Sequence, residues 1–350
     1  MVFRIKHEPG GQTFDGDENE TILGAALRAG ITLPYGCRTG HCGACRGGVL
    51  QGEVDHGETS PFVLGEAERA QGQALFCCAR PRSDLRIESR APALAADQPP
   101  RLLPARVERL ERVAPDVMRV ELKLPGSEAF SFRPGQYVDI LLSGGRRRAF
   151  SLASAPGGTT LELHIRRIRG GEFTGHVFDG LKLRDLVRIH GPHGSFGLHE
   201  ASDKPAIFVV RGTGFAPVKA ILEAELARGL RRDLILYRGG RQRQDLYFDA
   251  LVRDWAAAHP AFRYEPVLSA PAEADAWTGR TGSLDAAVLA DFPDLSGCEV
   301  YACGSPALVT AVRERFLDAG GLPAAAFFAD AFAFSGDVVR PRSSVPVEAE

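Results

Sequence analysis

The sequence predicts a multidomain chain of α+β and α/β class, with a small mixed domain, a β domain of barrel or sandwich type and a parallel α/β domain. Three observations lead to this prediction. Five of the seven cysteines lie in the first quarter of the chain, a proline-containing stretch without periodicity covers 91–101, and apolar strands alternate with helical segments from about residue 199. We expect domains at 1–92, 105–198 and 199–334, a linker at 93–104 and a loose C-terminal tail at 335–350.

Composition and charge exclude several classes of protein. The 350 residues are 44% hydrophobic and 25% charged, as in ordinary globular chains. The near-balance of 42 basic and 44 acidic residues argues against nucleic-acid binding, which needs a basic excess. No apolar run approaches the ~20 residues that span a bilayer, and the N-terminal residues lack the apolar centre of a signal peptide. We therefore expect a cytoplasmic protein, in which seven cysteines do not form a disulfide framework.

The first segment is expected to fold as a small mixed sheet with one helix. The alternation in 2–6 is typical of a half-buried strand, and the later strand signals lie at 49–53 and 85–88. The stretch 20–30 places its apolar residues on one helical face, and Gly30 provides a C-terminal stop.

The middle segment carries short strands separated by glycine and proline, a spacing typical of a barrel or sandwich. Between 93 and 198 the basic residues outnumber the acidic ones by five. This excess makes the middle segment the expected binding region for an anionic ligand. The expected strands include 117–124, 137–142, 161–165 and 186–189.

The last segment has the rhythm of a parallel sheet covered by helices. Its expected strands are 206–210, 234–237, 264–268 and 300–302, and its expected helices lie near 217–228, 248–258, 283–290 and 306–319.

The cysteine spacing carries the strongest chemical signal. Cys37-x4-Cys42-x2-Cys45, followed 32 positions later by Cys77, is the plant-type spacing for a [2Fe–2S] cluster, which four soft thiolates can hold. A four-cysteine zinc site is the alternative, although zinc ribbons usually pair two short knuckles. The adjacent Cys78 is expected to point the opposite way on a strand, as a small buried side chain.

A second motif, Arg148-Ala149-Phe150-Ser151, lies between Phe132–Tyr137 and Gly170–Thr174. Together these segments resemble the ferredoxin–NADP reductase superfamily, in which an Arg-x-Tyr-Ser motif binds FAD. The resemblance implies a β-grasp ferredoxin domain, an antiparallel β-barrel FAD domain and a parallel α/β nicotinamide-binding domain. It also implies that Arg148, Gly171 and Thr174 bind the FAD pyrophosphate, that Phe150 replaces the usual tyrosine on the isoalloxazine, and that Ser151 acts near flavin N5.

The same resemblance extends to two segments in the C-terminal half of the chain. Gly212-Thr213-Gly214 and Pro217 follow an apolar strand and open a helix, as in nicotinamide-binding motifs. Cys303-Gly304 matches the pair that lies beside the reacting nicotinamide carbon, which makes Ser151 and Cys303 the candidate catalytic residues.

Several basic residues surround these segments. Arg211 stands where the superfamily usually has a small residue. Arg238, Arg241 and Arg243 occupy the region that normally sets cofactor preference. The choice between NADH and NADPH as the electron donor remains open at this point, with NADH favoured.

His190 and His193 flank a Gly-Pro turn and are interpreted as structural.

Taken together, these motifs imply an electron-transfer reductase in which FAD connects a two-electron nicotinamide donor with a one-electron [2Fe–2S] cluster. Leu75–Cys78, Trp277–Gly279 and Phe327–Phe332 look most like the CDP-6-deoxy-3,4-glucoseen reductases of 3,6-dideoxy sugar synthesis. The implied partner is a separate acceptor protein, either a sugar dehydrase or the component of a multicomponent oxygenase. A non-enzymatic, zinc-bearing, nucleotide-sensing scaffold is the alternative from another class.

Overall fold

The computed structural model describes residues 1–89, 99–126 and 130–332 of the chain. They divide into two compact units. The first unit comprises the described residues of 1–99, together with 194–196 and 329–332. The second unit holds the rest of the described chain, in two sheets. The expected tail at 335–350 and the first half of the expected linker, 93–98, lie outside the described residues.

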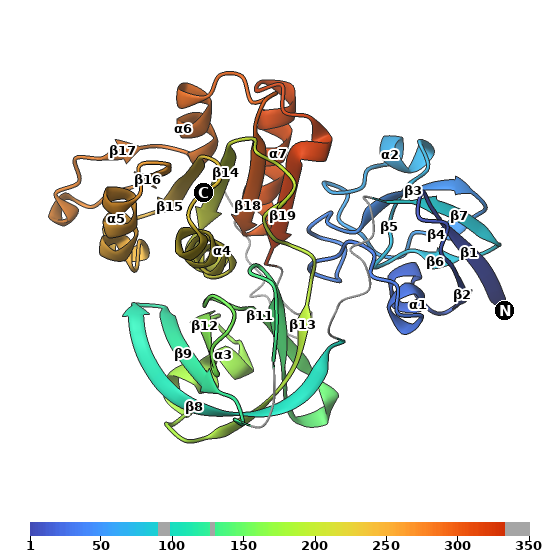
Figure 1. The fold of residues 1–350 in the computed structure, drawn as a ribbon, viewed down its shortest axis with the longest axis horizontal. Coiled ribbons are helices and arrows are strands. Elements are labelled where there is room, and N and C mark those ends of the chain that lie inside the picture. Colours follow the sequence, from blue (N-terminus) through green and yellow to red (C-terminus); the bar gives the residue numbers. More distant parts are fainter. Residues whose placement is uncertain (90–98, 127–129, 333–350) are drawn as a thin grey trace. The chain divides into compact units, whose positions relative to one another are not determined.

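The first unit contains a mixed five-stranded sheet with the order β2-β1-β7-β3-β5 (Figure 1). β1 pairs antiparallel with β2 and parallel with β7. The elements are β1 (Val2–Glu8), β2 (Thr13–Asp17), α1 (Ile22–Arg28), β3 (Arg46–Gln51), β4 (Val54–Asp55), α2 (Glu66–Ala70), β5 (Gln73–Leu75), β6 (Arg80–Pro81) and β7 (Leu85–Glu88).

Helix α1 forms because its apolar residues recur on one face and its first turn is capped. Ile22, Leu23 and Ala26 are buried, and the hydroxyl of Thr21 accepts a hydrogen bond from the Gly24 N–H at 3.1 Å. The helix ends at Arg28, two residues before Gly30, whose φ is 74°. The expected helix in this region is therefore present and slightly shorter than 20–30.

The second unit begins with a six-stranded antiparallel sheet of order β11-β10-β13-β8-β9-β12. Its first strand starts inside the expected linker, at Arg101. Among the described residues, the strand pairing leaves this sheet open, and an isolated antiparallel bridge joins Leu152 to Leu163 across its two edges. The elements are β8 (Arg101–Ala114), β9 (Val117–Lys123), β10 (Tyr137–Leu141), β11 (Arg147–Ser151), β12 (Thr160–Arg166), α3 (Glu172–Asp179) and β13 (Leu186–His193).

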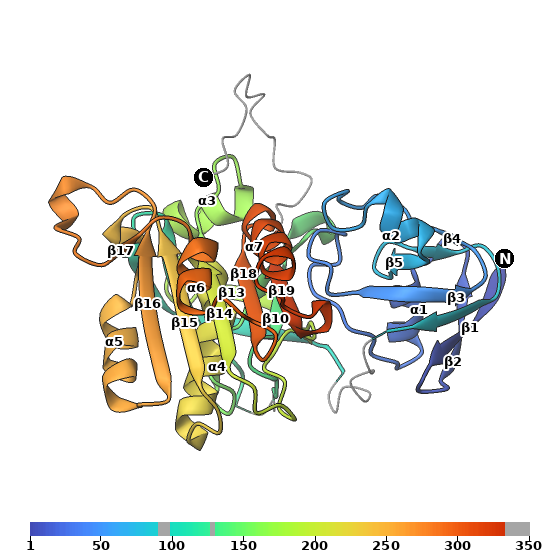
Figure 2. The same ribbon diagram turned by 90° about the horizontal axis from the view of Figure 1, so that it is seen from above.

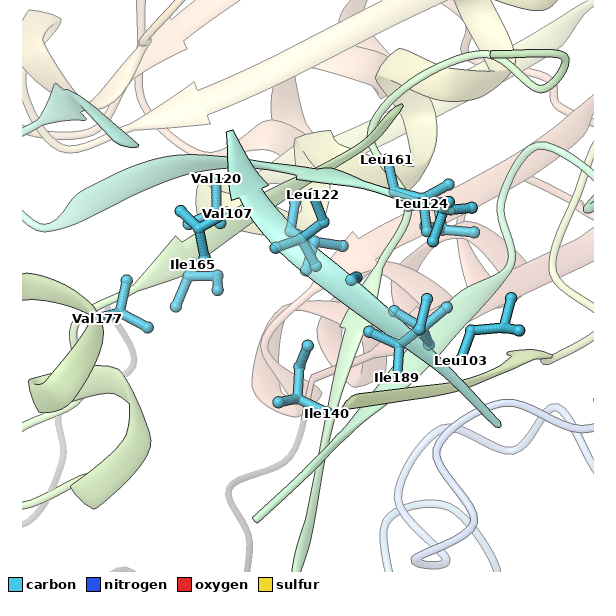
Figure 3. Packing of buried hydrophobic residues seen from close by; sticks show 14 of the residues in the cluster. Leu103, Val107, Val120, Leu122, Leu124, Ile140, Leu161, Ile165, Val177 and Ile189 are labelled. Carbon is cyan, nitrogen blue, oxygen red and sulfur yellow. The ribbon is translucent and has the colours of Figure 1, made fainter. Parts of the chain in front are cut away.

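A hydrophobic core fills the inner face of this sheet (Figure 3). Alternate residues of each strand point inward because side chains alternate across a strand. Residues from α3 close one side of the core. The core side chains include Leu103, Val107, Val120, Leu122, Ile140, Leu161, Ile165, Val177 and Ile189.

The second sheet of this unit has the order β17-β16-β15-β14-β18-β19, with β14 parallel to both β15 and β18. Helices α4 and α5 cover one face, and α6 and α7 cover the other (Figures 1 and 2). The predicted parallel α/β arrangement is present. The elements are β14 (Ala206–Arg211), α4 (Phe215–Arg228), β15 (Leu234–Gly240), α5 (Asp249–Ala258), β16 (Phe262–Leu268), β17 (Arg280–Thr281), α6 (Leu284–Asp291), β18 (Glu299–Gly304), α7 (Pro306–Asp318) and β19 (Phe327–Ala331).

Within residues 1–89, 99–126 and 130–332, no helix combines the length and the apolar character needed to cross a membrane.

Candidate functional site

The four cysteines of the predicted cluster motif come together in the first unit. Cys37, Cys42 and Cys45 lie on the loop between α1 and β3, and Cys77 lies in the turn after β5. Strands β3 and β5 pair antiparallel with Arg46 opposite Leu75, and the Phe76 N–H donates to the Cys45 carbonyl at 3.0 Å. This register brings the two ends of the motif together although 32 residues separate Cys45 from Cys77.

The loop directs backbone N–H groups at its sulfurs. The Thr39 and His41 N–H groups each lie 3.4 Å from Cys37 Sγ, and the Cys37 N–H lies 3.4 Å from Cys42 Sγ. Gly40 makes this possible with a φ of 74°, where a Cβ would also lie 3.0 Å from the Cys78 sulfur. Such N–H groups stabilise negative charge on sulfur, as a thiolate-ligated cluster requires.

The charge state of the thiols fits a metal-binding donor set. The hydrogen bond from Cys42 lowers the pKa of Cys37 to about 5. The same bond raises the pKa of Cys42, and a hydrogen bond to Cys45 raises the pKa of Cys77. The sulfurs are too close for all four to ionise without a cation among them. The iron of a [2Fe–2S] cluster would supply that positive charge.

Cys78 differs from its expected placement. Residues 76–78 form a turn, so consecutive side chains do not alternate as on a strand, and the Cys77 and Cys78 sulfurs lie 3.6 Å apart. The thiol of Cys78 is partly exposed. It borders a surface hollow of about 750 Å³ whose lining includes Thr39, His41, Phe62, Cys77 and Arg80. The expectation of an opposite-facing, buried side chain is therefore wrong.

The predicted flavin residues lie at one edge of the antiparallel sheet. Arg148, Phe150 and Ser151 belong to the edge strand β11, where Arg148 and Phe150 share a face. The rings of Phe150 and Phe173 are 5.6 Å apart, which links β11 to the start of α3. Ser151 is 9% exposed and stands opposite Tyr137 on β10. The structure thus brings an arginine, an aromatic surface and a helix start to the same edge.

The start of α3 offers backbone donors suited to a pyrophosphate. Gly171 is the N-cap, and the N–H groups of the first turn have no partner within the helix. The Thr174 hydroxyl, however, is engaged within the loop. It accepts from the Ile168 N–H at 3.1 Å and lies 3.3 Å from the Gly171 carbonyl. Thr174 therefore shapes the turn with its side chain, and only its N–H remains suited to the expected phosphate contact.

The glycine motif forms a tight turn between β14 and α4. Gly212 has a φ of 59°, and a Cβ on Gly214 would lie 2.4 Å from the Cys303 carbonyl oxygen. Val210 pairs with Cys303, so the turn and the Cys303-Gly304 pair lie at the same end of the parallel sheet. Pro217 occupies the first turn of α4, as expected. This close backbone packing is the arrangement expected for a dinucleotide-binding turn, and Thr213 is its middle residue.

Only some of the expected arginines lie at the surface. Arg241 and Arg243 are exposed, whereas Arg238 is 1% exposed. The Arg238 guanidinium lies 3.9 Å from the Phe215 ring centroid and 4.7 Å from that of Tyr247. Its Nη1 and Nη2 atoms have no hydrogen-bond partner among the described residues. Arg238 is therefore buried against the first residue of α4 and does not present its guanidinium at the surface, as Arg241 and Arg243 do.

A buried polar network that the sequence analysis did not identify connects the two sheets of this unit. Glu162 and His164 on β12 are joined by a hydrogen bond of 2.8 Å, and Lys219 on α4 lies 3.1 Å from Glu162. The Tyr247 hydroxyl lies 3.1 Å from His164 Nδ1 and 3.4 Å from the Gly212 carbonyl. The network therefore reaches the nicotinamide motif. Its one sequence signal is the interruption of the apolar strand 161–165 by two polar residues.

Burial and pairing set the charges of this network. Burial lowers the pKa of His164 to about 4, although Glu162 opposes that effect. Burial alone would raise the pKa of Glu162, but the hydrogen bond with His164 and the charge of Lys219 lower it to about 2. The neutral His164 donates from Nε2 to Glu162, and its Nδ1 accepts from Tyr247.

Comparison with known proteins agrees with these three sites. Residues 5–82 match the 2Fe-2S iron-sulfur cluster binding domain, residues 104–197 the oxidoreductase FAD-binding domain, and residues 208–314 the oxidoreductase NAD-binding domain. These matches confirm the three predicted cofactors, and with them the iron–sulfur interpretation of the four cysteines over the zinc alternative.

Two curated relatives and one solved structure resemble most of the chain. The CDP-6-deoxy-L-threo-D-glycero-4-hexulose-3-dehydrase reductase of Yersinia pseudotuberculosis is 39% identical over 334 residues, which cover 95% of this chain and 99% of the relative. The aromatic O-demethylase reductase subunit of Amycolatopsis is 41% identical over 322 residues, covering 90% and 94%. The crystal structure of the Amycolatopsis cytochrome P450 reductase GcoB has a TM-score of 0.75 and 38% identity, covering 94% of this chain and 98% of that one.

Proposed function

Because the chain belongs to the family of iron–sulfur flavoprotein reductases, which combine [2Fe–2S], FAD-binding and NAD-binding domains, we propose that it delivers electrons to a separate sugar dehydrase. The proposed acceptor acts on a CDP-linked 4-keto-6-deoxy sugar during 3,6-dideoxy sugar synthesis. Electrons pass from NAD(P)H to FAD, then to the [2Fe–2S] cluster and then to the acceptor.

Each step of this path has its own residues. When bound, FAD exchanges two electrons with a nicotinamide and single electrons with an iron–sulfur cluster. Arg148 and the first turn of α3 bind the pyrophosphate, and Phe150 provides the apolar surface for the ring. Ser151 would offer its hydroxyl near flavin N5. Cys303 shapes the nicotinamide pocket from the end of β18. The Leu152–Leu163 bridge supports closure of the FAD-binding sheet into a barrel.

The acceptor is proposed to dock over the cluster loop. Cys37 is partly exposed there, and Phe62, which exposes 74% of its surface, lines the same hollow as Thr39 and Cys77. An exposed aromatic side chain beside a redox centre is a suitable anchor for a partner, because aromatic residues dominate binding at protein interfaces.

We choose a sugar dehydrase as the acceptor because the match to the dehydrase reductase extends over almost the whole chain. The 39% identity extends over 95% of this chain and 99% of that relative, so it includes all three cofactor domains and the segments between them. The Trp277 and Phe327–Phe332 segments, which resemble the same reductases, add to this argument.

A second candidate function is the reductase component of an oxygenase. The 41% identity to the aromatic O-demethylase reductase subunit and the TM-score of 0.75 to a cytochrome P450 reductase favour it. Both acceptors would take electrons singly from the cluster, so the intramolecular path is the same.

Reconstitution with each acceptor tests the proposal. NADH, this protein and a CDP-4-keto-6-deoxyglucose dehydrase should together yield the 3,6-dideoxy sugar, with NADH consumed in step with product. Absence of the sugar, together with efficient NADH-driven turnover of an oxygenase component, would assign the chain to the second function.

The docking surface can be tested separately. The change Phe62→Ser should lower the rate of acceptor reduction about 10-fold or more, because a central aromatic anchor contributes ~2 kcal/mol or more to binding. NADH–ferricyanide activity should not change. Leu186→Ser is the matched control, since Leu186 is 73% exposed on the FAD-binding sheet. Equal losses in both variants would exclude Phe62 as the docking residue.

A further inference from the structure

Two histidines and an aspartate meet on one face of the FAD-binding sheet, outside the residues assigned to the cofactors. Asp139 lies on β10, and His190 and His193 lie on β13. His190 Nδ1 is 2.9 Å from His193 Nε2, which is itself 3.6 Å from Asp139 Oδ2. One nitrogen or oxygen atom from each residue lies within 4.8 Å of the others.

An irregularity in the strand pairing creates this cluster. His193 stands opposite Tyr137, and His190 stands opposite Asp139. These two pairs are three residues apart on β13 but only two residues apart on β10. Residues three apart on a regular strand face opposite sides of the sheet, and an extra residue brings them to the same side. The rings of His193 and Tyr137, 5.4 Å apart, lie together on that side.

The set has the chemistry of a transition-metal site. Imidazole nitrogens suit zinc, copper, nickel and iron, and a carboxylate commonly completes the ligand set. Ligand atoms around a tetrahedral zinc ion are about 3.3 Å apart, given metal–ligand bonds of about 2.0–2.1 Å. The separations of 2.9 and 3.6 Å lie on either side of that value.

The surroundings favour a built site over a chance surface cluster. Asp139 is 1% exposed and His193 is 4% exposed, whereas His190 is half-buried and gives access from solvent. Arg147 Nη1 lies 3.9 Å from Asp139 Oδ2, beyond hydrogen-bond distance. The Arg147 side chain is 50% exposed, so it can turn away when an ion takes its place.

We propose that Asp139, His190 and His193 bind one zinc ion, with water completing the coordination. The ion joins β10 to β13. Because β10 also pairs with β11, which carries Arg148 and Ser151, zinc stiffens the strand that supports the flavin residues. The site has a structural role and takes no part in electron transfer.

Calorimetry on the complete holoprotein tests the proposal. The protein is depleted of zinc with a chelator, its iron and FAD contents are verified, and it is titrated with Zn²⁺. One ion per chain should bind. His193→Gln and Asp139→Asn should each weaken binding by more than the ~10–100-fold that loss of an outer-shell partner causes, because each removes a ligand. His259→Gln, which alters a histidine on another element, should leave binding unchanged.

A spectroscopic measurement identifies the ligands. X-ray absorption at the zinc edge should show nitrogen and oxygen at about 2.0–2.1 Å, with the imidazole signal reduced in His190→Gln, a milder change at a half-exposed position. Sulfur at about 2.3 Å would place the zinc on cysteine and overturn the proposal. Absence of zinc binding, or binding that all three variants retain, would overturn it equally.

Discussion

Ser151 illustrates how much of the proposed chemistry depends on single side chains. It ends an edge strand, is 9% exposed and stands opposite Tyr137. We expect Ser151→Ala to slow flavin reduction by NADH roughly 10²-fold or more, because a positioned polar group is removed where charge develops during the transfer. Nicotinamide binding should change little. Stopped-flow absorbance at the flavin band measures both quantities from the dependence of the rate on NADH concentration.

Substitution of the neighbouring arginine should act differently. Arg148→Ala should release FAD during gel filtration, since a pyrophosphate contact is lost. Arg188→Ala, which changes an exposed arginine on β13, is its control and should retain FAD.

For the Ser151→Ala variant, flavin reduction at the wild-type rate would remove Ser151 from the catalytic residues.

At the scale of elements, the turn between β14 and α4 depends on close backbone packing. A Cβ on Gly214 would lie 2.4 Å from the carbonyl oxygen of Cys303, and neither backbone can move without separating the turn from β18. Gly214→Ala should therefore raise the KM for NADH more than 10-fold while the FAD spectrum stays unchanged. Steady-state ferricyanide reduction provides the measurement.

Gly297→Ala is the matched control for this change. A Cβ at Gly297 meets no atom within 4 Å, and its φ is not in the left-handed region. The KM of Gly297→Ala for NADH should equal that of the wild type. If Gly214→Ala also left KM unchanged, the turn would not contact the nicotinamide cofactor.

The buried network between β12 and α4 predicts a loss of stability in acid. The folded pKa of His164 is about 4, below its ordinary value of 6.5, so the unfolded chain takes up a proton first as the pH falls. The stabilisation is complete above pH 6.5 and is lost as the pH falls toward 4. Glu162, with a folded pKa of about 2, extends the loss from pH 4.5 downward. The midpoint temperature of FAD release should decrease accordingly.

The variant His164→Phe separates this effect from general acid lability. It keeps a ring against Phe215, whose centroid lies 6.3 Å from that of His164, but removes the titrating group. The midpoint temperature of FAD release from this variant should vary less between pH 6.5 and 4 than that of the wild type. Identical pH profiles for the two proteins would show that His164 does not control stability.

At the scale of the whole molecule, the iron–sulfur motif belongs to one compact unit and the two nucleotide motifs to the other. We expect Cys42→Ser to abolish the cluster while NADH–ferricyanide activity, which requires only FAD and the nicotinamide site, remains. Iron and acid-labile sulfide analysis measures the first effect, and ferricyanide reduction the second. Reduction of the protein acceptor should be lost.

Cys298→Ser is a suitable control, because Cys298 lies in the other unit and outside every motif. It should retain cluster and acceptor activity. Loss of ferricyanide activity in a folded, FAD-containing Cys42→Ser protein would contradict a modular electron path.

The sequence by itself determined the cofactors and the order of the motifs that bind them. The cysteine spacing, the Arg148–Ser151 motif and the glycine turn are signals between residues close along the chain, where local geometry requires particular residue types. The alternation of strands and helices likewise predicted the parallel sheet. The domain boundaries and the individual catalytic roles of Ser151 and Cys303 remain predictions.

Only the tertiary structure decided which way certain side chains face and what surrounds them. A turn at 76–78 places Cys78 beside Cys77, and a pairing irregularity places His190 and His193 on one face. Arg238 is buried against Phe215 because α4 covers β15 there. Each result depends on contacts or strand register between segments far apart in the chain, and a one-residue change of register reverses the face that a side chain occupies.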